Sequence, residues 1–157
     1  MSVFKFISPS EEDTKRLAQR LALMLRANDC LALIGNFGSG KTTFTKGLAD
    51  GLGVRKKNYV CSPSFVILKI YPGRLSLYHF DLYRLDRFLD WEHIGLDEFM
   101  EAGGVAVIEW AERIKKYLPA HALRIEFSVL GPKKRRIRFL SHQVRWKNIF
   151  KKLKSES

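Results

Sequence analysis

The sequence predicts an α/β fold whose central sheet is partly parallel and carries antiparallel flanking strands. Cys30–Ile34 and Gly104–Glu109 are continuous apolar runs, as expected for strands that are buried on both faces of a sheet. Segments with helical periodicity alternate with the strand candidates, which is typical of α/β proteins. Leu123–Val129 and Arg135–Leu140 surround the turn signal Gly131-Pro132, which predicts an antiparallel pair.

The N-terminal region predicts a strand followed by an amphipathic helix. Val3–Ile7 is strand-like, and Ser10 has the character of a helix N-cap because three acidic residues follow it. Leu17, Leu21 and Leu25 then repeat every four residues and form one apolar helix face. Both elements precede the first buried strand.

The middle of the chain predicts a hairpin and several short helices. Phe65–Tyr71 and Leu75–Asp81 are strand-like and are joined by the turn signal Pro72-Gly73. Arg84–Glu101 is mixed in character and is expected to contain short helices. Ala111–Tyr117 is expected to form another short helix after the second buried strand.

Length and composition predict a single domain over residues 1–157. The chain has 157 residues, 46% of them hydrophobic, which is enough for one core. No apolar run reaches the roughly 18–20 residues of a membrane span, and the N-terminus lacks the pattern of a secretory signal. Cys30 and Cys61 lack metal-ligand spacing, so we expect two reduced thiols in a cytoplasmic protein.

The basic character of the chain is concentrated near its C-terminus. The net charge is +12, and residues 133–157 hold 10 Lys and Arg residues against one acid, Glu156. Residues 142–154 predict a basic amphipathic helix with an apolar stripe of Trp146, Ile149, Phe150 and Leu153. Contact of this helix and of Lys133–Arg136 with tRNA phosphates is one interpretation. The alternative is a solvated basic face over an apolar stripe that packs on the domain.

A glycine-rich segment between a predicted buried strand and a predicted helix, about Lys41–Leu52, indicates a phosphate site. Gly35–Thr42 reads G-N-F-G-S-G-K-T and matches the Walker A pattern G-x-x-x-x-G-K-[ST]. Glycines let the backbone wrap around phosphates, and N–H groups of the loop and helix form an anion nest. Lys41 is expected to reach the β- and γ-phosphates, and the Thr42 hydroxyl to bind Mg²⁺. The sequence therefore predicts a three-layer, P-loop NTPase-like fold.

Two acids at the ends of predicted strands are candidates for holding the metal. A P-loop enzyme needs a carboxylate near the end of a buried strand for Mg²⁺ or its water. Asp81 and Glu109 both end hydrophobic strands, so both are expected to converge on Thr42. Chemistry alone does not decide which acid binds the metal and which positions water. His79 is expected to be structural, because the sequence shows no set of zinc ligands around it.

The sequence leaves alternatives open for the bound nucleotide and for the class of function. No N-K-x-D segment, the guanine-reading signature of many GTPases, follows the loop, which favours ATP. An ATPase is the main interpretation. A small-molecule kinase would use the same loop, with Arg84–Arg87 as part of a lid. A nucleic-acid-binding module carried by the basic C-terminal segment is the third.

Four segments, in this order, carry a resemblance to a known family. They are G-N-F-G-S-G-K-T-T at Gly35–Thr43, V-C-S-P-S-F at Val60–Phe65, H-F-D-L-Y-R at His79–Arg84 and E-W-A-E-R at Glu109–Arg113. The first is shared by many nucleotide-binding proteins, whereas the other three in combination are specific. Together they resemble TsaE (also called YjeE), the small bacterial ATPase family needed to make threonylcarbamoyladenosine in tRNA. The resemblance covers about residues 10–140.

The resemblance implies roles for individual residues. Val60–Phe65 resembles a switch-like loop that senses the γ-phosphate. Asp81 resembles the acid that serves Mg²⁺, and Glu109 the second acid, near the metal and the attacking water. The expected catalytic residues are thus Lys41, Asp81 and Glu109, and the expected metal ligands are Thr42, Asp81 and Glu109. The expected nucleotide-binding residues are Asn36, Phe37, Gly38, Ser39, Gly40, Lys41, Thr42, Thr43, Ser64, Trp110 and Arg113.

The resemblance also implies cofactors and partners. It implies a protein that binds ATP or ADP with Mg²⁺ and is not itself the modifying enzyme. In the family, TsaD paired with TsaB is the transferase, and TsaE hydrolyses ATP when engaged with them, so activity in isolation should be weak. Two positions depart from the family pattern, Ser64 where threonine is usual and Ala111 where proline is common. Neither removes a chemical group that the site needs.

Overall fold

The computed structural model describes residues 1–55, 67–84 and 95–156. The strands are β1 (Ser2–Ser8), β2 (Cys30–Ile34), β3 (Leu68–Tyr71), β4 (Leu77–Asp81), β5 (Val105–Glu109), β6 (Leu123–Val129) and β7 (Arg135–Ser141). The helices are α1 (Glu11–Ala22), α2 (Lys41–Gly51), α4 (Leu96–Met100), the 3₁₀ helix η2 (Ala111–Tyr117) and α5 (Val144–Ser155).

One seven-stranded sheet in the order β1-β7-β6-β2-β5-β4-β3 organises the chain. Strands β6, β2, β5 and β4 are mutually parallel neighbours, whereas β3, β7 and β1 are added antiparallel. The predicted β3–β4 and β6–β7 hairpins are both present. One edge of the sheet is formed by β1, which pairs with β7. Its Phe4 ring packs against Phe139 of β7 and Phe150 of α5.

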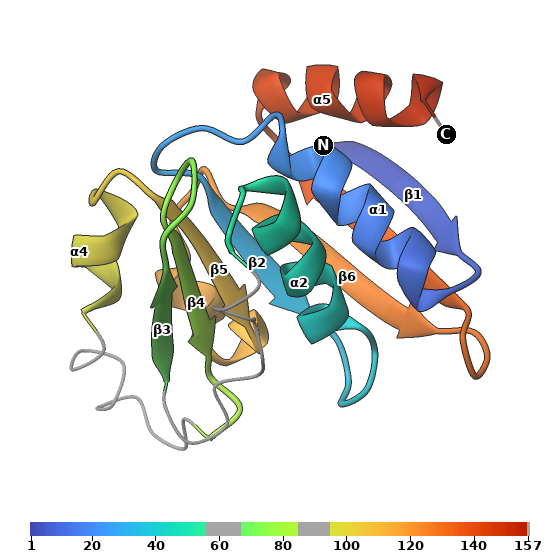
Figure 1. Cartoon of the computed structure of the whole chain (residues 1–157), viewed down its shortest axis with the longest axis horizontal. Helices are drawn as coiled ribbons and strands as arrows, with labels where there is room; N and C mark the ends of the chain where they lie inside the picture. Colours follow the sequence, from blue (N-terminus) through green and yellow to red (C-terminus); the bar gives the residue numbers. More distant parts are fainter. Residues whose placement is uncertain (56–66, 85–94, 157) are drawn as a thin grey trace.

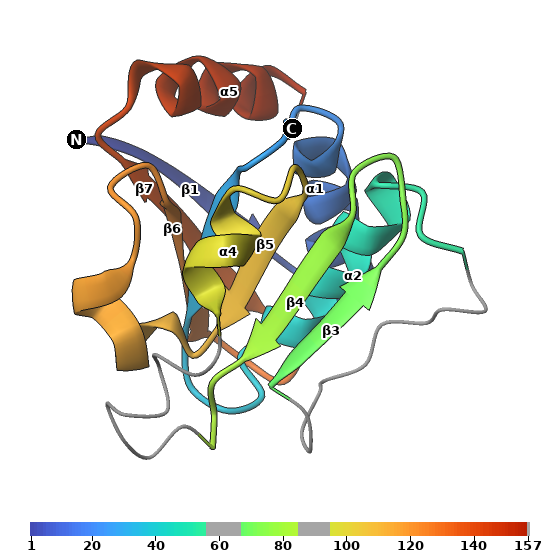
Figure 2. The same ribbon diagram turned by 90° about the vertical axis from the view of Figure 1, so that its left-hand side faces the viewer.

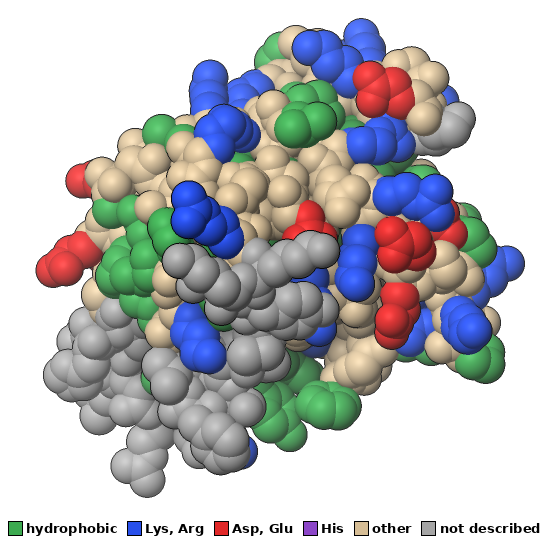
Figure 3. Space-filling view, viewed as in Figure 1, with side chains coloured by type: hydrophobic (Ala, Val, Ile, Leu, Met, Phe, Trp, Pro, Cys, Tyr) green, Lys and Arg blue, Asp and Glu red, His purple; other side chains and the backbone are tan. Residues whose placement is uncertain are grey.

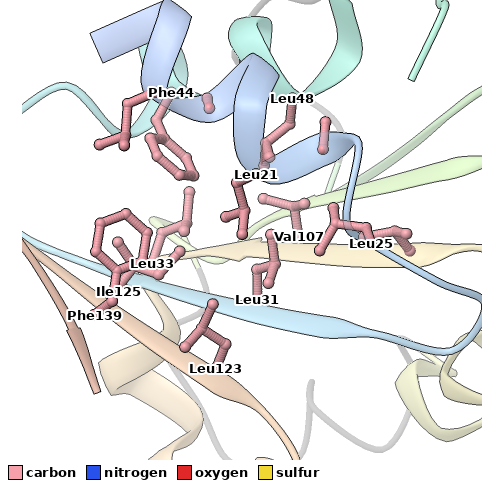
Figure 4. Packing of buried hydrophobic residues seen from close by; sticks show 14 of the residues in the cluster. Leu21, Leu25, Leu31, Leu33, Phe44, Leu48, Val107, Leu123, Ile125 and Phe139 are labelled. Carbon is pink, nitrogen blue, oxygen red and sulfur yellow. The ribbon is translucent and has the colours of Figure 1, made fainter. Parts of the chain in front are cut away.

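Helices cover both faces of the sheet, which gives three layers (Figures 1 and 2). The sheet has one hydrophobic core on each face, because side chains alternate in direction along its strands. In β5, Val105 and Val107 face α1, α2 and α5, while Ala106 and Ile108 face α4 and η2. Figure 4 shows Leu21 of α1 and other residues of the larger core meeting the sheet. The predicted α/β class, with a partly parallel sheet and antiparallel flanks, is confirmed.

Helices α1 and α2 are in backbone-to-backbone contact. A Cβ at Gly47 would lie 2.5 Å from the carbonyl oxygen of Lys15, and a Cβ at Gly51 would lie 2.5 Å from the Cβ of Ala22. Only glycine permits this approach. At its start, α1 is capped as predicted, because the Ser10 hydroxyl accepts a hydrogen bond of 3.1 Å from the Asp13 N–H. These contacts fix the direction of α2, whose first turn carries Lys41.

The C-terminal helix α5 packs its apolar stripe into the larger core. Its buried residues are Trp146, Ile149, Phe150 and Leu153. Arg145 anchors the helix through hydrogen bonds of 2.6 and 2.8 Å to the two carboxylate oxygens of Asp29, just before β2. The opposite side of α5 is basic, and Figure 3 shows Lys and Arg side chains gathered over this helix.

Part of the predicted structure lies outside the described residues. This applies to Val60–Phe65, with Ser64, to the first residues of the predicted strand Phe65–Tyr71, and to the last three positions of Arg84–Arg87. In the ranges that are described, no helix combines the length and the apolar character that a membrane span requires.

Candidate functional site

The glycine-rich loop joins the carboxyl end of β2 to the start of α2. Gly38 and Gly40 have φ values of 74° and 106°, which side chains rarely tolerate. At Gly35, a Cβ would lie 2.6 Å from the Ser39 hydroxyl and 3.0 Å from the carbonyl oxygen of Phe127. The Ser39 hydroxyl oxygen is buried and has no hydrogen-bond partner among the described residues. The loop is therefore tightly wrapped, and it contains one buried polar group that a bound anion could satisfy.

Lys41, the first residue of α2, points back over this loop. Its ammonium group donates hydrogen bonds to the carbonyl oxygens of Gly35 and Asn36. It also lies 3.9 Å from the centroid of a Trp110 ring, a cation–π contact. Burial lowers the pKa of Lys41, and the negative charges of Glu112, Glu109 and Asp81, in this order, oppose that shift. The carboxylates therefore help to keep a buried cation at the loop.

Glu109, at the carboxyl end of β5, is a buried acid held by two side chains. The Thr42 hydroxyl donates a hydrogen bond of 2.8 Å to Oε1 of Glu109. On its other oxygen, Oε2, the same carboxylate is hydrogen-bonded to Nε2 of the fully buried His79. Thus β4, β5 and α2 each contribute one member of a continuous polar chain.

Asp81 lies beside Glu109, because the two residues are register partners on the parallel strands β4 and β5. One carboxylate oxygen of Asp81, Oδ1, accepts a hydrogen bond of 3.0 Å from the Tyr83 N–H. The ends of β4 and β5 thus bring both predicted acids to the edge of the sheet where α2 begins. Convergence of Asp81 and Glu109 at this edge is the arrangement that strand-end placement predicts.

Aromatic side chains surround the entrance of the site. Trp110 follows β5 in a left-handed backbone conformation, with φ 60° and ψ 38°, which is uncommon for a bulky residue. The ring of Tyr83 lies 5.1 Å from Trp110 and 6.1 Å from Phe37, as measured between centroids. Phe37 itself is 83% exposed. Trp110 packs against the smaller core, and Lys41 lies over its ring.

These elements enclose a cavity of about 670 Å³, within the size range of small-molecule sites. The predicted site residues that line it are Phe37, Gly38, Ser39, Gly40, Lys41, Thr42, Thr43, Asp81, Glu109 and Trp110. Asn36 contributes its carbonyl oxygen to Lys41 instead of lining the cavity. Arg113 is also outside the lining, with its guanidinium 5.8 Å from the Trp110 ring centroid. Ser64 lies outside the described residues.

Sequence reasoning missed one wall of this cavity. Glu11 and Thr14 of α1 and Lys133 and Arg135 of the β6–β7 hairpin line it. Arg135 donates a hydrogen bond of 3.1 Å to the carbonyl oxygen of Gly38 and so ties the hairpin to the loop. From the sequence, the run Lys133–Arg136 is either a contact for tRNA phosphates or a solvated basic face, and neither interpretation places it at this cavity. Its place at the cavity depends on the pairing of β6 with β2, which no local pattern indicates.

The donors in the cavity suit a hard cation rather than zinc. Among the described residues, no three His, Cys, Asp or Glu side chains gather as a metal site. The predicted magnesium ligands are a hydroxyl and two carboxylates, Thr42, Asp81 and Glu109, and Mg²⁺ is usually held by few carboxylates together with phosphate oxygens and water. All three residues line the same cavity, so the donor set fits this ion.

Comparison with known proteins identifies the family. The family model described as "Threonylcarbamoyl adenosine biosynthesis protein TsaE" matches residues 8–137. The chain belongs to the TsaE family. The proteins of this family take part in the biosynthesis of threonylcarbamoyladenosine in tRNA. The predicted resemblance is thereby confirmed.

Individual TsaE proteins match along most of their length. The "tRNA threonylcarbamoyladenosine biosynthesis protein TsaE" of Bacillus subtilis is 39% identical over 154 residues, which cover 98% of this chain and 95% of the relative. The TsaE of Treponema pallidum is 40% identical over 131 residues, or 83% and 96% of the two chains. The crystal structure of Bacillus subtilis YdiB superposes with a TM-score of 0.81 at 35% identity, covering 99% of this chain and 96% of YdiB.

Proposed function

We propose that this TsaE protein binds ATP with Mg²⁺ and hydrolyses it as a component of tRNA N6-threonylcarbamoyladenosine biosynthesis, in association with TsaB and TsaD. The observation that supports this most is the convergence of Lys41, Thr42, Asp81 and Glu109 in one cavity next to a glycine-rich loop. In α/β sheets with helices on both faces, ligands bind at the carboxyl ends of the strands. This cavity lies at that edge.

The residues of the loop and of α2 would hold the triphosphate. N–H groups of the loop and the first turn of α2 supply an anion nest, and the Ser39 hydroxyl supplies a further donor. Lys41 would exchange its carbonyl partners for phosphate oxygens. Arg135 and Lys133 would add positive charge to the lining of the cavity. Stabilisation of the developing negative charge by such groups is the main catalytic resource for phosphoryl transfer.

The acids would divide the remaining tasks. Thr42, Asp81 and Glu109 would hold Mg²⁺, which when bound neutralises charge on the phosphates. Glu109 would also orient the attacking water, because its carboxylate is already fixed by Thr42 and His79. With the water in line, the protein contributes positioning rather than covalent chemistry.

The decisive experiment measures ATP hydrolysis by the purified protein, alone and with TsaB and TsaD from the same organism. Weak activity alone and strong stimulation by the partners are expected, with Glu109→Ala lowering the stimulated rate by about 100-fold. If ATP binds but the partners do not stimulate hydrolysis, the assignment to a partner-activated ATPase is wrong. In that case, a screen for phosphorylated small molecules tests the kinase alternative, whose lid residue Arg84 lines the cavity.

Contact with tRNA remains a separate prediction. Lys133 and Arg135 of the basic segment Lys133–Arg136 line the cavity. The positive charges that would contact tRNA phosphates would therefore come mainly from α5. Lys147, Lys151, Lys152 and Lys154 of this helix are exposed. Replacing these four lysines by glutamine is expected to weaken tRNA affinity and its dependence on salt. Unchanged affinity would leave α5 with a packing role.

A further inference from the structure

His79 is a buried polar side chain that the predicted mechanism did not use. It lies in the middle of β4 with no exposed surface. Side chains alternate along a strand, so His79 and Asp81 share the face of Leu77, which belongs to the core under α1 and α2. On the neighbouring strand, Glu109 shares the face of Val105 and Val107. His79 therefore lies on the side of the sheet from which α2 presents Thr42.

The two oxygens of the Glu109 carboxylate have different partners. Thr42 donates to Oε1 at 2.8 Å, and Oε2 is bonded to Nε2 of His79. A carboxylate with only one oxygen held can still rotate about its last side-chain torsion, which is a soft, roughly two-fold torsion. A second partner on the other oxygen fixes its plane. His79 thus supplies a constraint that Thr42 alone does not.

The partners of His79 decide which ring nitrogen carries the hydrogen. An ionised carboxylate only accepts hydrogen bonds, so Nε2 of His79 is the donor to Glu109. Nδ1 of the ring is buried and has no partner among the described residues. An N–H there would be an unsatisfied donor. The arrangement therefore selects the Nε2–H tautomer, with the bare nitrogen facing the interior.

We propose that His79 is a positioning residue that holds the carboxylate of Glu109 in the orientation needed at Thr42. This inference rests on the proposed function, because the orientation matters only if Glu109 serves Mg²⁺ and the attacking water. The role is one of geometry, since His79 itself does not line the cavity. Partners of this kind behind a ligand typically change metal affinity or activity by about 10–100-fold when removed.

Two amide variants test the proposal against a purely structural role. The amide nitrogen of glutamine is as many bonds from Cβ as Nε2 of histidine, whereas that of asparagine corresponds to Nδ1. His79→Gln can therefore still donate to Glu109, and His79→Asn cannot. Asparagine is one methylene shorter than glutamine, so the melting temperature of both variants is measured beside turnover, to separate a loss of folding from a loss of positioning.

The expected result separates the two variants. With TsaB, TsaD and Mg²⁺ present, His79→Asn should lower the ATP turnover number by about tenfold or more, with KM changed by less than about threefold. His79→Gln should stay within about threefold of the wild type. Equal turnover of the two variants, or wild-type turnover in His79→Asn, would overturn the positioning role.

A second readout does not depend on activity. A long-range ¹H–¹⁵N spectrum of the protein without nucleotide, assigned with His79→Gln, should show the Nε2–H tautomer, and Glu109→Ala should shift its signal. An Nδ1–H tautomer overturns the proposal even when hydrolysis is normal. Failure of the wild type to bind ATP in a titration would instead overturn the proposed function, and with it the reason for the constraint.

Discussion

Two buried carboxylates at opposite ends of the parallel strands have contrasting partners. Asp29, just before β2, is 5% exposed and accepts hydrogen bonds from Nη1 and Nη2 of Arg145 and from the backbone N–H of Arg26. Glu109, at the end of β5, is 2% exposed and is hydrogen-bonded to the side chains of Thr42 and His79. The first carboxylate is paired with an arginine within the fold, whereas the second lines the cavity. The amino end of β2 thus carries a structural ion pair, and the carboxyl end of β5 carries part of the proposed catalytic site.

The largest expected effect lies at the structural end. Arg145→Ala would leave Asp29 buried without its counter-charge and remove a polar contact that anchors α5, so the free energy of unfolding should fall by about 3 kcal/mol. Urea denaturation measures the loss. Lys147→Ala, on the exposed side of the same helix, is the matched control and should change stability by less than about 0.5 kcal/mol. If the two variants are equally stable, the Asp29–Arg145 pair does not anchor the helix.

The next effect lies at the functional end. Glu109→Ala should reduce partner-stimulated ATP turnover by about 100-fold, the usual contribution of a positioned acid–base group. ATP affinity, measured by calorimetry, should change far less, because Lys41 and the loop remain. Retained turnover would remove Glu109 from the mechanism. Together with Arg145→Ala, this variant shows whether the two carboxylates separate stability from activity.

Lys41 should have a smaller effect, and on binding rather than on turnover alone. Lys41→Ala removes a charge-assisted contact to phosphate, worth about 1.5–3 kcal/mol, so ATP affinity should fall by about 10–100-fold. Calorimetric titration with Mg²⁺ and ATP measures this change. Lys46→Ala, one turn further along α2 and outside the cavity lining, is the control. Unchanged affinity in Lys41→Ala would contradict the phosphate assignment of the loop.

The smallest effect concerns pH. Burial, with a contribution from the charge of Asp29, raises the pKa of Cys30 to about 12 from 9.0. The folded state therefore favours the neutral thiol, and this stability is fully present below pH 9 and is lost as the pH rises towards 12. At pH 10 the loss should be roughly 1 kcal/mol relative to Cys30→Ala. Equal pH dependence of both proteins between pH 8 and 10 would show that the thiol is not shielded.

The sequence predicts the parts of the fold and site that local patterns determine. Apolar runs gave the buried strands, and the glycine spacing gave the loop and Lys41. The acids Asp81 and Glu109 follow from their places at strand ends, since parallel strands end at the same edge. Each of these predictions needs only a few neighbouring residues.

What sequence could not predict depends on register between distant segments. The contact between His79 and Glu109 requires β4 and β5 to pair so that Asp81 faces Glu109. The contact of Arg135 with Gly38 requires the β6–β7 hairpin to lie beside β2. A shift of one residue would turn these side chains to the other face. No single segment encodes such pairings, so the sequence predicts the loop and the two strand-end acids but not the contacts that His79 and Arg135 make with them.

The glycine contact between α1 and α2 has a mechanical consequence. Gly47 and Gly51 bring the two helix backbones into direct contact, so the helices cannot slide past each other without steric overlap. Glu11 and Thr14 on α1 and Lys41 on α2 line the same cavity, so the contact between the helices holds these three residues in fixed positions relative to one another. Tyr83 and Trp110, which follow β4 and β5, line the same cavity. Replacing Gly47 or Gly51 by a larger residue would therefore push the two helices apart without changing a side chain that lines the cavity.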